Sequence, residues 1–306
     1  MRIAFSVGLL LACTACIPRP EAKPAPVAMA PVSQPVAPPP PQVVAPSIFG
    51  LDRQPEQGAL LKGMVPLGTS LLLLDGKPVR FAPDGTFIIG FERDAQPNAV
   101  LEARMQNGRL LRLPLTVSPH AWDISELKTL SRGTSPSAAY QRIRSAELAQ
   151  IETARAANVD SDGWRQCFQW PAVGRISTLF GSQRIYAGGV RGAYHGGLDI
   201  ARAVGGQDIT GTPALAPADG VVVLATDNPF SLEGNLVMID HGFGLVSAMM
   251  HLQRIQVRTG QRISRGQPIG TIGMTGRATG PHLHWGMTWN GLRIDPLFLV
   301  GPMPGT

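Results

Sequence analysis

Tight-turn dipeptides divide most of this chain into short apolar runs, and this pattern restricts the fold more than any other feature. Asp75–Gly76, Asp84–Gly85 and Asn107–Gly108 separate apolar runs in the first half, and Asn290–Gly291 ends a run near the C-terminus. Such dipeptides favour the two-residue turns of β-hairpins. The sequence therefore predicts a mainly β protein, and a length of 306 residues suits about two domains.

Composition divides the chain into five predicted segments. Residues 17–46 hold eleven prolines and favour an extended tether rather than a packed core. Residues 47–122 predict a small, Ig-like β-sandwich, and residues 164–306 predict a larger antiparallel β-sheet domain with a groove. Between them, residues 123–163 read as a helical linker, because alanine, glutamate, arginine and glutamine dominate the stretch from 135 to 158. We expect Ser135 to cap this helix, with Pro136 at its first position.

The first sixteen residues resemble a bacterial lipoprotein signal. Arg2 precedes an apolar run, Ile3–Ala12, that is too short to span a bilayer as a helix and ends in "LLAC". In such signals the cysteine becomes the lipidated first residue after cleavage, which predicts lipidation at Cys13, with Cys16 as the alternative. A plain secretory signal is the other interpretation. The resemblance implies a periplasmic protein anchored to a membrane by lipid, and the threonine after the cysteine favours the outer membrane.

Charge and cysteine content add two weaker expectations. The formal net charge of +6 favours an anionic polymer or membrane surface as a partner, although ordinary solubility explains it equally well. Cys167 is the only cysteine after residue 16, so we expect a packed small residue there rather than an internal disulfide or a nucleophile.

Histidines cluster in three apolar segments of the C-terminal half. In "GPHLHWG", His282 and His284 fall on one face of a predicted strand, while the apolar residues between and after them share the opposite face. Two imidazoles on one face are either a metal-ligand pair or two solvated residues. His195 and Asp199 stand four positions apart and also share a face, and His251 ends a third apolar run. Strands of one sheet could bring all these side chains to one groove, and this donor set suits zinc.

The segments "HGGLD", "MMHL" and "GMTGRATGPHLHWG" closely resemble the lysostaphin/LytM-type zinc metallopeptidases, which cut peptidoglycan peptides. The resemblance extends over about residues 170–298, with the glycine turns between the motifs in the same order. It implies that His195, Asp199 and His284 are ligands of Zn²⁺, and that His251 and His282 are catalytic. Long glycine-rich stretches on both sides of the first motif predict enlarged rims around the groove, and such loops often set specificity.

The resemblance implies a zinc-dependent peptidoglycan endopeptidase that hydrolyses amide bonds in the peptide stems or cross-links, with the bond between D-alanine and diaminopimelate favoured. Two alternatives stay open. One is a regulator that binds and activates cell-wall amidases, although such relatives usually lack one or more of the five residues. The other is a peptidase that acts on a protein substrate. Expected partners are peptidoglycan, the membrane through the lipid anchor and a candidate regulatory protein, but no nucleic acid. The N-terminal β module could also dock over the groove as an inhibitor.

Overall fold

The protein is described by a computed structural model. The residues described are 42–43, 45–129, 137–202 and 206–305. The predicted signal, with Cys13 and Cys16, and most of the proline-rich tether lie outside these residues, as do Ser135 and Pro136.

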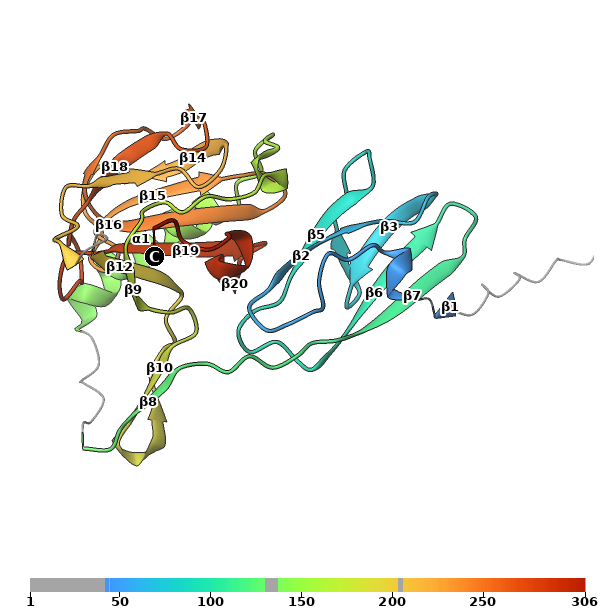
Figure 1. The fold of residues 1–306 in the computed structure, drawn as a ribbon, viewed down its shortest axis with the longest axis horizontal. Coiled ribbons are helices and arrows are strands. Elements are labelled where there is room, and N and C mark those ends of the chain that lie inside the picture. The colour runs from blue at the N-terminus through green and yellow to red at the C-terminus, as the bar shows by residue number, and fades with distance from the viewer. Residues whose placement is uncertain (1–41, 44, 130–136, 203–205, 306) are drawn as a thin grey trace, which may run out of the picture. The chain divides into compact units, whose positions relative to one another are not determined.

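The N-terminal module contains two sheets around a shared core, as the turn pattern predicts (Figure 1). Its elements are η1 Pro46–Ile48, β1 Gln42–Val43, β2 Leu60–Met64, β3 Thr69–Leu74, β4 Lys77–Val79, β5 Thr86–Gly90, β6 Asn98–Met105 and β7 Leu110–Thr116. The larger sheet has the order β1-β7-β6-β3-β4, and β2 pairs with β5. Asp75 and Gly76 join β3 to β4 with φ values of 49° and 76°, as a tight hairpin turn requires.

The C-terminal domain is built on one ten-stranded sheet, in which every pairing is antiparallel. Its strands are β9 Arg175–Thr178, β12 Gly197–Arg202, β13 Pro213–Leu215, β14 Gly220–Ala225, β15 Asn235–Asp240, β16 Leu245–Ile255, β17 Arg262–Ile263, β18 Pro268–Ile272, β19 Leu283–Trp289 and β20 Leu292–Ile294. Short 3₁₀ turns flank the sheet at η2 Gly163–Arg165 and η5 Pro296–Leu299. The main strand order is β17-β14-β15-β16-β19-β12-β9. Leu198, Ile200 and Trp285 are fully buried on the core side, as the alternating pattern predicts.

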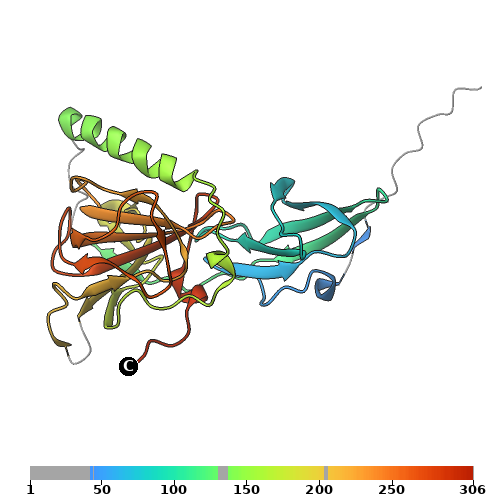
Figure 2. The same cartoon turned by 90° about the horizontal axis from the view of Figure 1, so that it is seen from above.

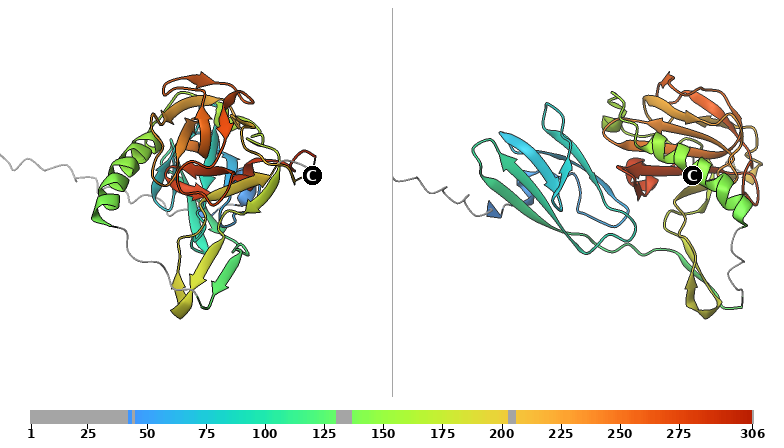
Figure 3. Two further views of the ribbon diagram at one scale, coloured as in Figure 1. Left: turned by 90° about the vertical axis from the view of Figure 1, so that its left-hand side faces the viewer. Right: turned by 180° about the vertical axis from the view of Figure 1, so that it is seen from behind.

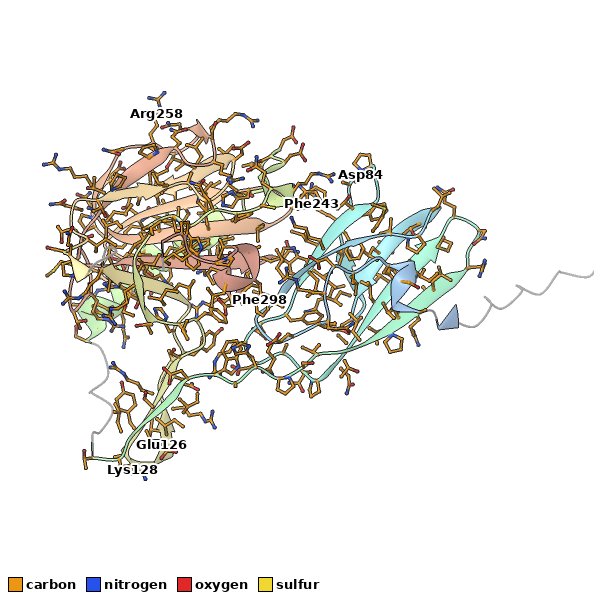
Figure 4. The ribbon with its side chains drawn as sticks, viewed as in Figure 1. Asp84, Glu126, Lys128, Phe243, Arg258 and Phe298 are labelled. Carbon is orange, nitrogen blue, oxygen red and sulfur yellow. The ribbon has the colours of Figure 1, made fainter. Side chains whose placement is uncertain are left out.

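A three-stranded sheet adjoins this domain and was not predicted. It consists of β8 Ile124–Leu127, β10 Gln183–Tyr186 and β11 Val190–Arg191, in the order β11-β10-β8, with η3 Ala187–Gly189 as the turn (Figure 1). β8 lies in the predicted helical linker but forms a strand, because its backbone pairs in parallel with β10, which comes far later in the sequence. Figure 4 places Glu126 and Lys128 at the tip of this ribbon.

The one long helix in the described part of the chain, α1 Ala138–Arg155, covers one face of the C-terminal sheet (Figures 2 and 3). Its N-cap is Ser137, whose side chain accepts a hydrogen bond from the backbone N–H of Tyr140. The structure confirms that a helix forms within the predicted stretch. This helix packs onto the sheet of the C-terminal domain and does not only bridge two domains. Ile151 and Ala154 are buried against strands β15 and β16. Among the described residues, no helix is both long and apolar enough to cross a membrane.

The N-terminal module and the C-terminal domain share one continuous apolar core. The buried Arg93 also links them, because its Nε donates to the carbonyl oxygen of Gly181 at 2.9 Å. Lys62 Nζ donates to the carbonyl oxygen of Arg165 at 3.0 Å. Cys167, expected to be packed, is exposed near this junction. It follows that the N-terminal module contributes to the packing of the C-terminal domain.

Candidate metal centre and groove

Three of the predicted site residues converge where two neighbouring strands pair. Asp199 on β12 lies directly opposite His284 on β19. Side chains opposite each other in an antiparallel pair share one face of the sheet. His195 stands just before β12 and turns toward the same point. His195 Nε2 lies 3.0 Å from Asp199 Oδ1, and His284 Nδ1 lies 2.9 Å from the same oxygen. The two nitrogens are 3.0 Å apart.

This triangle of donor atoms fits a small tetrahedral cation. Zinc bonds of about 2.0–2.1 Å place neighbouring ligand atoms roughly 3.3 Å apart, close to all three observed separations. Hydrogen bonds alone do not explain this arrangement well. If His195 Nε2–H and His284 Nδ1–H both donated to Asp199 Oδ1, the two N–H groups would repel each other, because their nitrogens are only 3.0 Å apart. Two imidazole nitrogens and one carboxylate oxygen are ligands that zinc prefers.

The electrostatics of the three side chains also suit a metal. Burial opposes ionisation of Asp199, but hydrogen bonds from His195 and His284 outweigh it and hold the pKa of the carboxyl far below its ordinary value. Burial lowers the pKa of His284. A carboxylate anion beside a neutral imidazole is the protonation state that metal binding requires.

His251 approaches the triangle from a third strand, β16, at an irregular point. Its φ of 61° lies in the left-handed region, which is uncommon for a residue other than glycine, and the strand register shifts beyond it, between Leu252 and Arg254. The His251 backbone N–H donates to the carbonyl oxygen of Glu233 at 2.9 Å. Its ring centroid lies 4.6 Å from that of His282 and 6.2 Å from that of His284. The predicted catalytic pair is thus adjacent to the three predicted ligands.

Hydrogen bonds fix which nitrogen is free in the rings of His251 and His282. His251 Nδ1 lies 2.8 Å from the carbonyl oxygen of Thr275, and His282 Nδ1 lies 2.9 Å from that of Gly280. A carbonyl oxygen only accepts, so each Nδ1 carries a hydrogen, and Nε2 is the acceptor whenever the ring is in its neutral form. Burial lowers the pKa of His251 to about 4, so this ring is neutral at pH 7. Nε2 of His282 lies 3.7 Å from Asp199 Oδ1. The two rings can therefore accept and return protons beside the triangle.

These residues line a groove of about 880 Å³. Its floor is the side of β16 and β19 that carries Ala248, Met250, Gly286 and Thr288, beside the predicted ligands. Helix α1 forms one wall, and β8, β10 and the segment around Tyr194 contribute to the lining opposite. Of the described residues between 47 and 122, none lines this groove, which differs from the suggestion that the N-terminal module covers it. A cavity of this size accommodates a ligand of several residues.

Sequence reasoning missed an ion pair that connects α1 to the site. Arg144 Nη1 and Nη2 donate to the two carboxylate oxygens of Glu233, both at 2.6 Å, and the side chains of this pair are largely buried. Glu147 also accepts from Arg144, and it accepts from the backbone and hydroxyl of Ser231. Because the Glu233 carbonyl accepts from His251, helix α1 helps to hold the loop on which this histidine depends. No local pattern in the sequence indicates the pair.

His241 does not belong to the site. The side chain is fully buried, with Nδ1 2.8 Å from the carbonyl oxygen of Asp219 and Nε2 2.8 Å from the hydroxyl of Ser247. Both nitrogens are used within the core, so His241 has a structural role.

Comparisons with known proteins agree with this geometry. Residues 193–296 match the profile of peptidase family M23. Peptidoglycan DD-endopeptidase ShyA of Vibrio cholerae is 40% identical over 129 residues, which are 42% of this chain and 28% of ShyA. DD-carboxypeptidase/endopeptidase Mpg of Neisseria meningitidis is 36% identical over 110 residues, which are 36% of this chain and 24% of Mpg. The chain therefore spans only about a quarter of the length of these relatives.

One solved structure matches both the N-terminal module and the sheet domain. It is the crystal structure of a protein from Pseudomonas aeruginosa described as a peptidase M23, with a TM-score of 0.61 and 27% identity. The match covers 81% of this chain and 96% of that one. The C-terminal region of the present chain is thus a peptidase M23 domain of the LytM/lysostaphin type, as the sequence motifs predicted.

Proposed function

Because residues 193–296 form a peptidase M23 domain, we propose that this protein is a zinc-dependent endopeptidase that cleaves peptide cross-links of peptidoglycan. The observation that carries the proposal is the triangle of His195 Nε2, Asp199 Oδ1 and His284 Nδ1 on the floor of a groove. The two relatives named above are DD-peptidases by name, which favours the bond between D-alanine and diaminopimelate.

The chain's own residues divide the chemistry between them. His195, Asp199 and His284 would hold the zinc ion, and a peptide would lie along β19 in the groove. Zinc in a site with three protein ligands polarises a carbonyl group and lowers the pKa of water to about 7. The unprotonated Nε2 of His251 or His282 can take the proton of the attacking water and deliver it to the leaving amine. While the ring still holds this proton, before it passes to the amine, its Nε2–H can donate a hydrogen bond to the oxyanion.

The structure supports a role as a regulator of cell-wall amidases less well than a role as an endopeptidase. A protein that only binds through this groove has no need for three metal-ligand side chains and two oriented histidines. All five residues are present in this chain, and their side chains meet at one point of the groove. A peptidase with a protein substrate would use the same groove, so the choice of substrate needs a direct test.

Purified protein loaded with zinc should convert cross-linked dimers of isolated sacculi into monomers, as measured by chromatography and mass spectrometry of the muropeptides. We expect His284→Ala to abolish the conversion, because one ligand is lost. His120→Gln is the matched control, since His120 lies outside the groove and should keep full activity. An amidase regulator would instead give new products only when an amidase is added. Digestion by His284→Ala at the parental rate would refute the ligand assignment.

We also propose that the mature protein is anchored to the periplasmic face of the outer membrane through Cys13. The support is the sequence of the signal alone. Cys13→Ala should move the protein from the membrane to the soluble fraction, whereas Cys16→Ala should leave it anchored. Mass spectrometry of the mature N-terminus provides the readout. The opposite pattern would assign the lipid to Cys16, and a soluble parent would indicate a plain secretory signal.

A further inference from the structure

Cations outnumber anions on the lining of the groove. The arginines that line it are Arg144, Arg155, Arg184, Arg277 and Arg293, and the acidic residues are Asp123, Asp199 and Glu233. Arg144 pairs with Glu233, and Arg155 pairs with Glu152 on its own helix. Among the described residues, Arg293 forms no ion pair and its side chain is available to a ligand.

Arg293 has a fixed position relative to the metal centre. It lies on β20 directly opposite Thr288 of β19, so the two side chains share the groove face of the sheet. Thr288 stands four residues beyond His284 on the same strand, roughly 13 Å away at the usual rise per residue. Arg293 therefore lies to one side of the metal centre along the direction in which an extended peptide would run.

Packing holds the Arg293 side chain in place. Its guanidinium carbon lies 5.7 Å from the ring centroid of Tyr194, the residue before the first metal ligand. A Cβ built on Gly196 would lie only 3.3 Å from Arg293 Cδ, so the stem of the arginine rests on the glycine backbone. The Tyr194 ring is itself fixed by Arg93, which is only 4% exposed and has its guanidinium carbon 5.0 Å from that ring. A cation that is held in this way loses little conformational freedom when it binds an anion.

We propose that Arg293 is a specificity-determining residue that binds a carboxylate of the substrate peptide to one side of the scissile amide. A guanidinium matches a carboxylate with two parallel hydrogen bonds, which makes this contact stronger and more directional than contact with a neutral amide. The proposal rests on the proposed function, and it adds that the enzyme selects stems with free carboxylates over stems in which they are amidated.

Steady-state cleavage of soluble cross-linked muropeptides, with free or amidated carboxylates, tests this selection. The parent should have a KM about tenfold lower for the free form, with similar kcat values. Arg293→Gln should raise KM for the free form about tenfold and leave the amidated form unchanged, and Arg293→Lys should retain part of the preference. Arg258→Gln is the control, because it removes the same charge from an exposed position outside the groove (Figure 4). Equal KM values for both substrates in the parent, or Arg293→Gln indistinguishable from Arg258→Gln, would overturn the proposal.

Binding of an uncross-linked stem peptide, measured by calorimetry, separates this proposal from the proposed function. Tighter binding of the free than of the amidated stem, lost in Arg293→Gln, would support the carboxylate site even if no cross-link is cleaved. Cleavage of cross-links without this discrimination would refute the carboxylate site and leave the endopeptidase intact. The absence of both cleavage and discrimination would refute both.

Discussion

At the scale of single residues, surroundings decide what one side-chain type does. His241 and His251 both have pKa values lowered to about 4 by burial. His241 uses both nitrogens on Asp219 and Ser247, whereas His251 uses only Nδ1 and keeps Nε2 for the groove. The sequence motifs include His251 but not His241 among the predicted site residues. They could not indicate the left-handed backbone at His251, because it depends on how β16 pairs with strands from elsewhere in the chain.

Asp295 provides a prediction for stability at the same scale. Burial raises the pKa of its carboxyl to about 6, and its Oδ1 accepts from the backbone N–H of Leu297 at 2.9 Å. Since the pKa is higher in the folded than in the unfolded state, the contribution of this group to stability is greatest below about pH 4 and is lost as the pH rises to about 6. Asp295→Asn keeps the acceptor and removes the charge.

We therefore expect Asp295→Asn to be more stable than the parent at pH 7, by about 1–3 kcal/mol, with the gain disappearing near pH 4. Urea unfolding of both proteins across this pH range measures the difference. Asp160→Asn, at an exposed position, serves as the control. A gain that is the same at pH 4 and pH 7 would show that ionisation of Asp295 is not its cause.

At the scale of elements, a helix or hairpin could be predicted from the sequence only where adjacent residues specify it. The hairpin turns of the N-terminal module are specified by adjacent residues such as Asp75 and Gly76, and they were predicted correctly. β8 was missed, because a strand that pairs in parallel with a distant partner leaves no turn signal beside it. The helix was found, but its cap was misplaced, since Ser135 and Ser137 both suit that role. The docking of α1 on the sheet depends on Ile151 and a buried ion pair, and no local pattern specifies such long-range contacts.

The ion pair between Arg144 and Glu233 gives a prediction for α1. Removing one partner of a buried pair leaves an uncompensated charge, which typically costs about 3–5 kcal/mol. Arg144→Met should therefore destabilise the protein by roughly 3 kcal/mol and also lower kcat, because the Glu233 loop supports His251. The double variant Arg144→Met, Glu233→Met should regain most of the stability. Urea unfolding of the three proteins is the measurement, and additive losses in the double variant would contradict this account.

At the scale of the whole molecule, the N-terminal module supports the loop that carries the predicted ligand His195, and its described residues do not line the groove. Arg93 Nε donates to the carbonyl oxygen of Gly181, and the Gly181 N–H donates to the carbonyl oxygen of His195 at 2.9 Å. The same arginine packs on Tyr194 beside that ligand. The family motifs predict the ligands themselves, but the supporting Arg93 lies about a hundred positions earlier, and no local pattern in the sequence indicates its contact with Gly181.

This connection predicts a loss of metal affinity from a substitution in the other module. Groups that position a ligand typically change metal affinity about 10- to 100-fold when they are removed. We expect Arg93→Ala to weaken zinc binding about tenfold, measured by competition with a chelating dye. Arg112→Ala is the matched control, because Arg112 pairs with Glu102 within the N-terminal module and does not line the groove. Equal zinc affinities in the two variants would show that the module does not support the ligand loop.

The central claim is that two imidazole nitrogens and one carboxylate oxygen form a zinc site. The most direct measurement is an anomalous difference map, recorded at the zinc absorption edge, from crystals of the protein prepared with one equivalent of zinc. The account predicts a single strong peak about 2.0–2.2 Å from each of His195 Nε2, Asp199 Oδ1 and His284 Nδ1. A strong peak at other residues, with none inside this triangle, would contradict it.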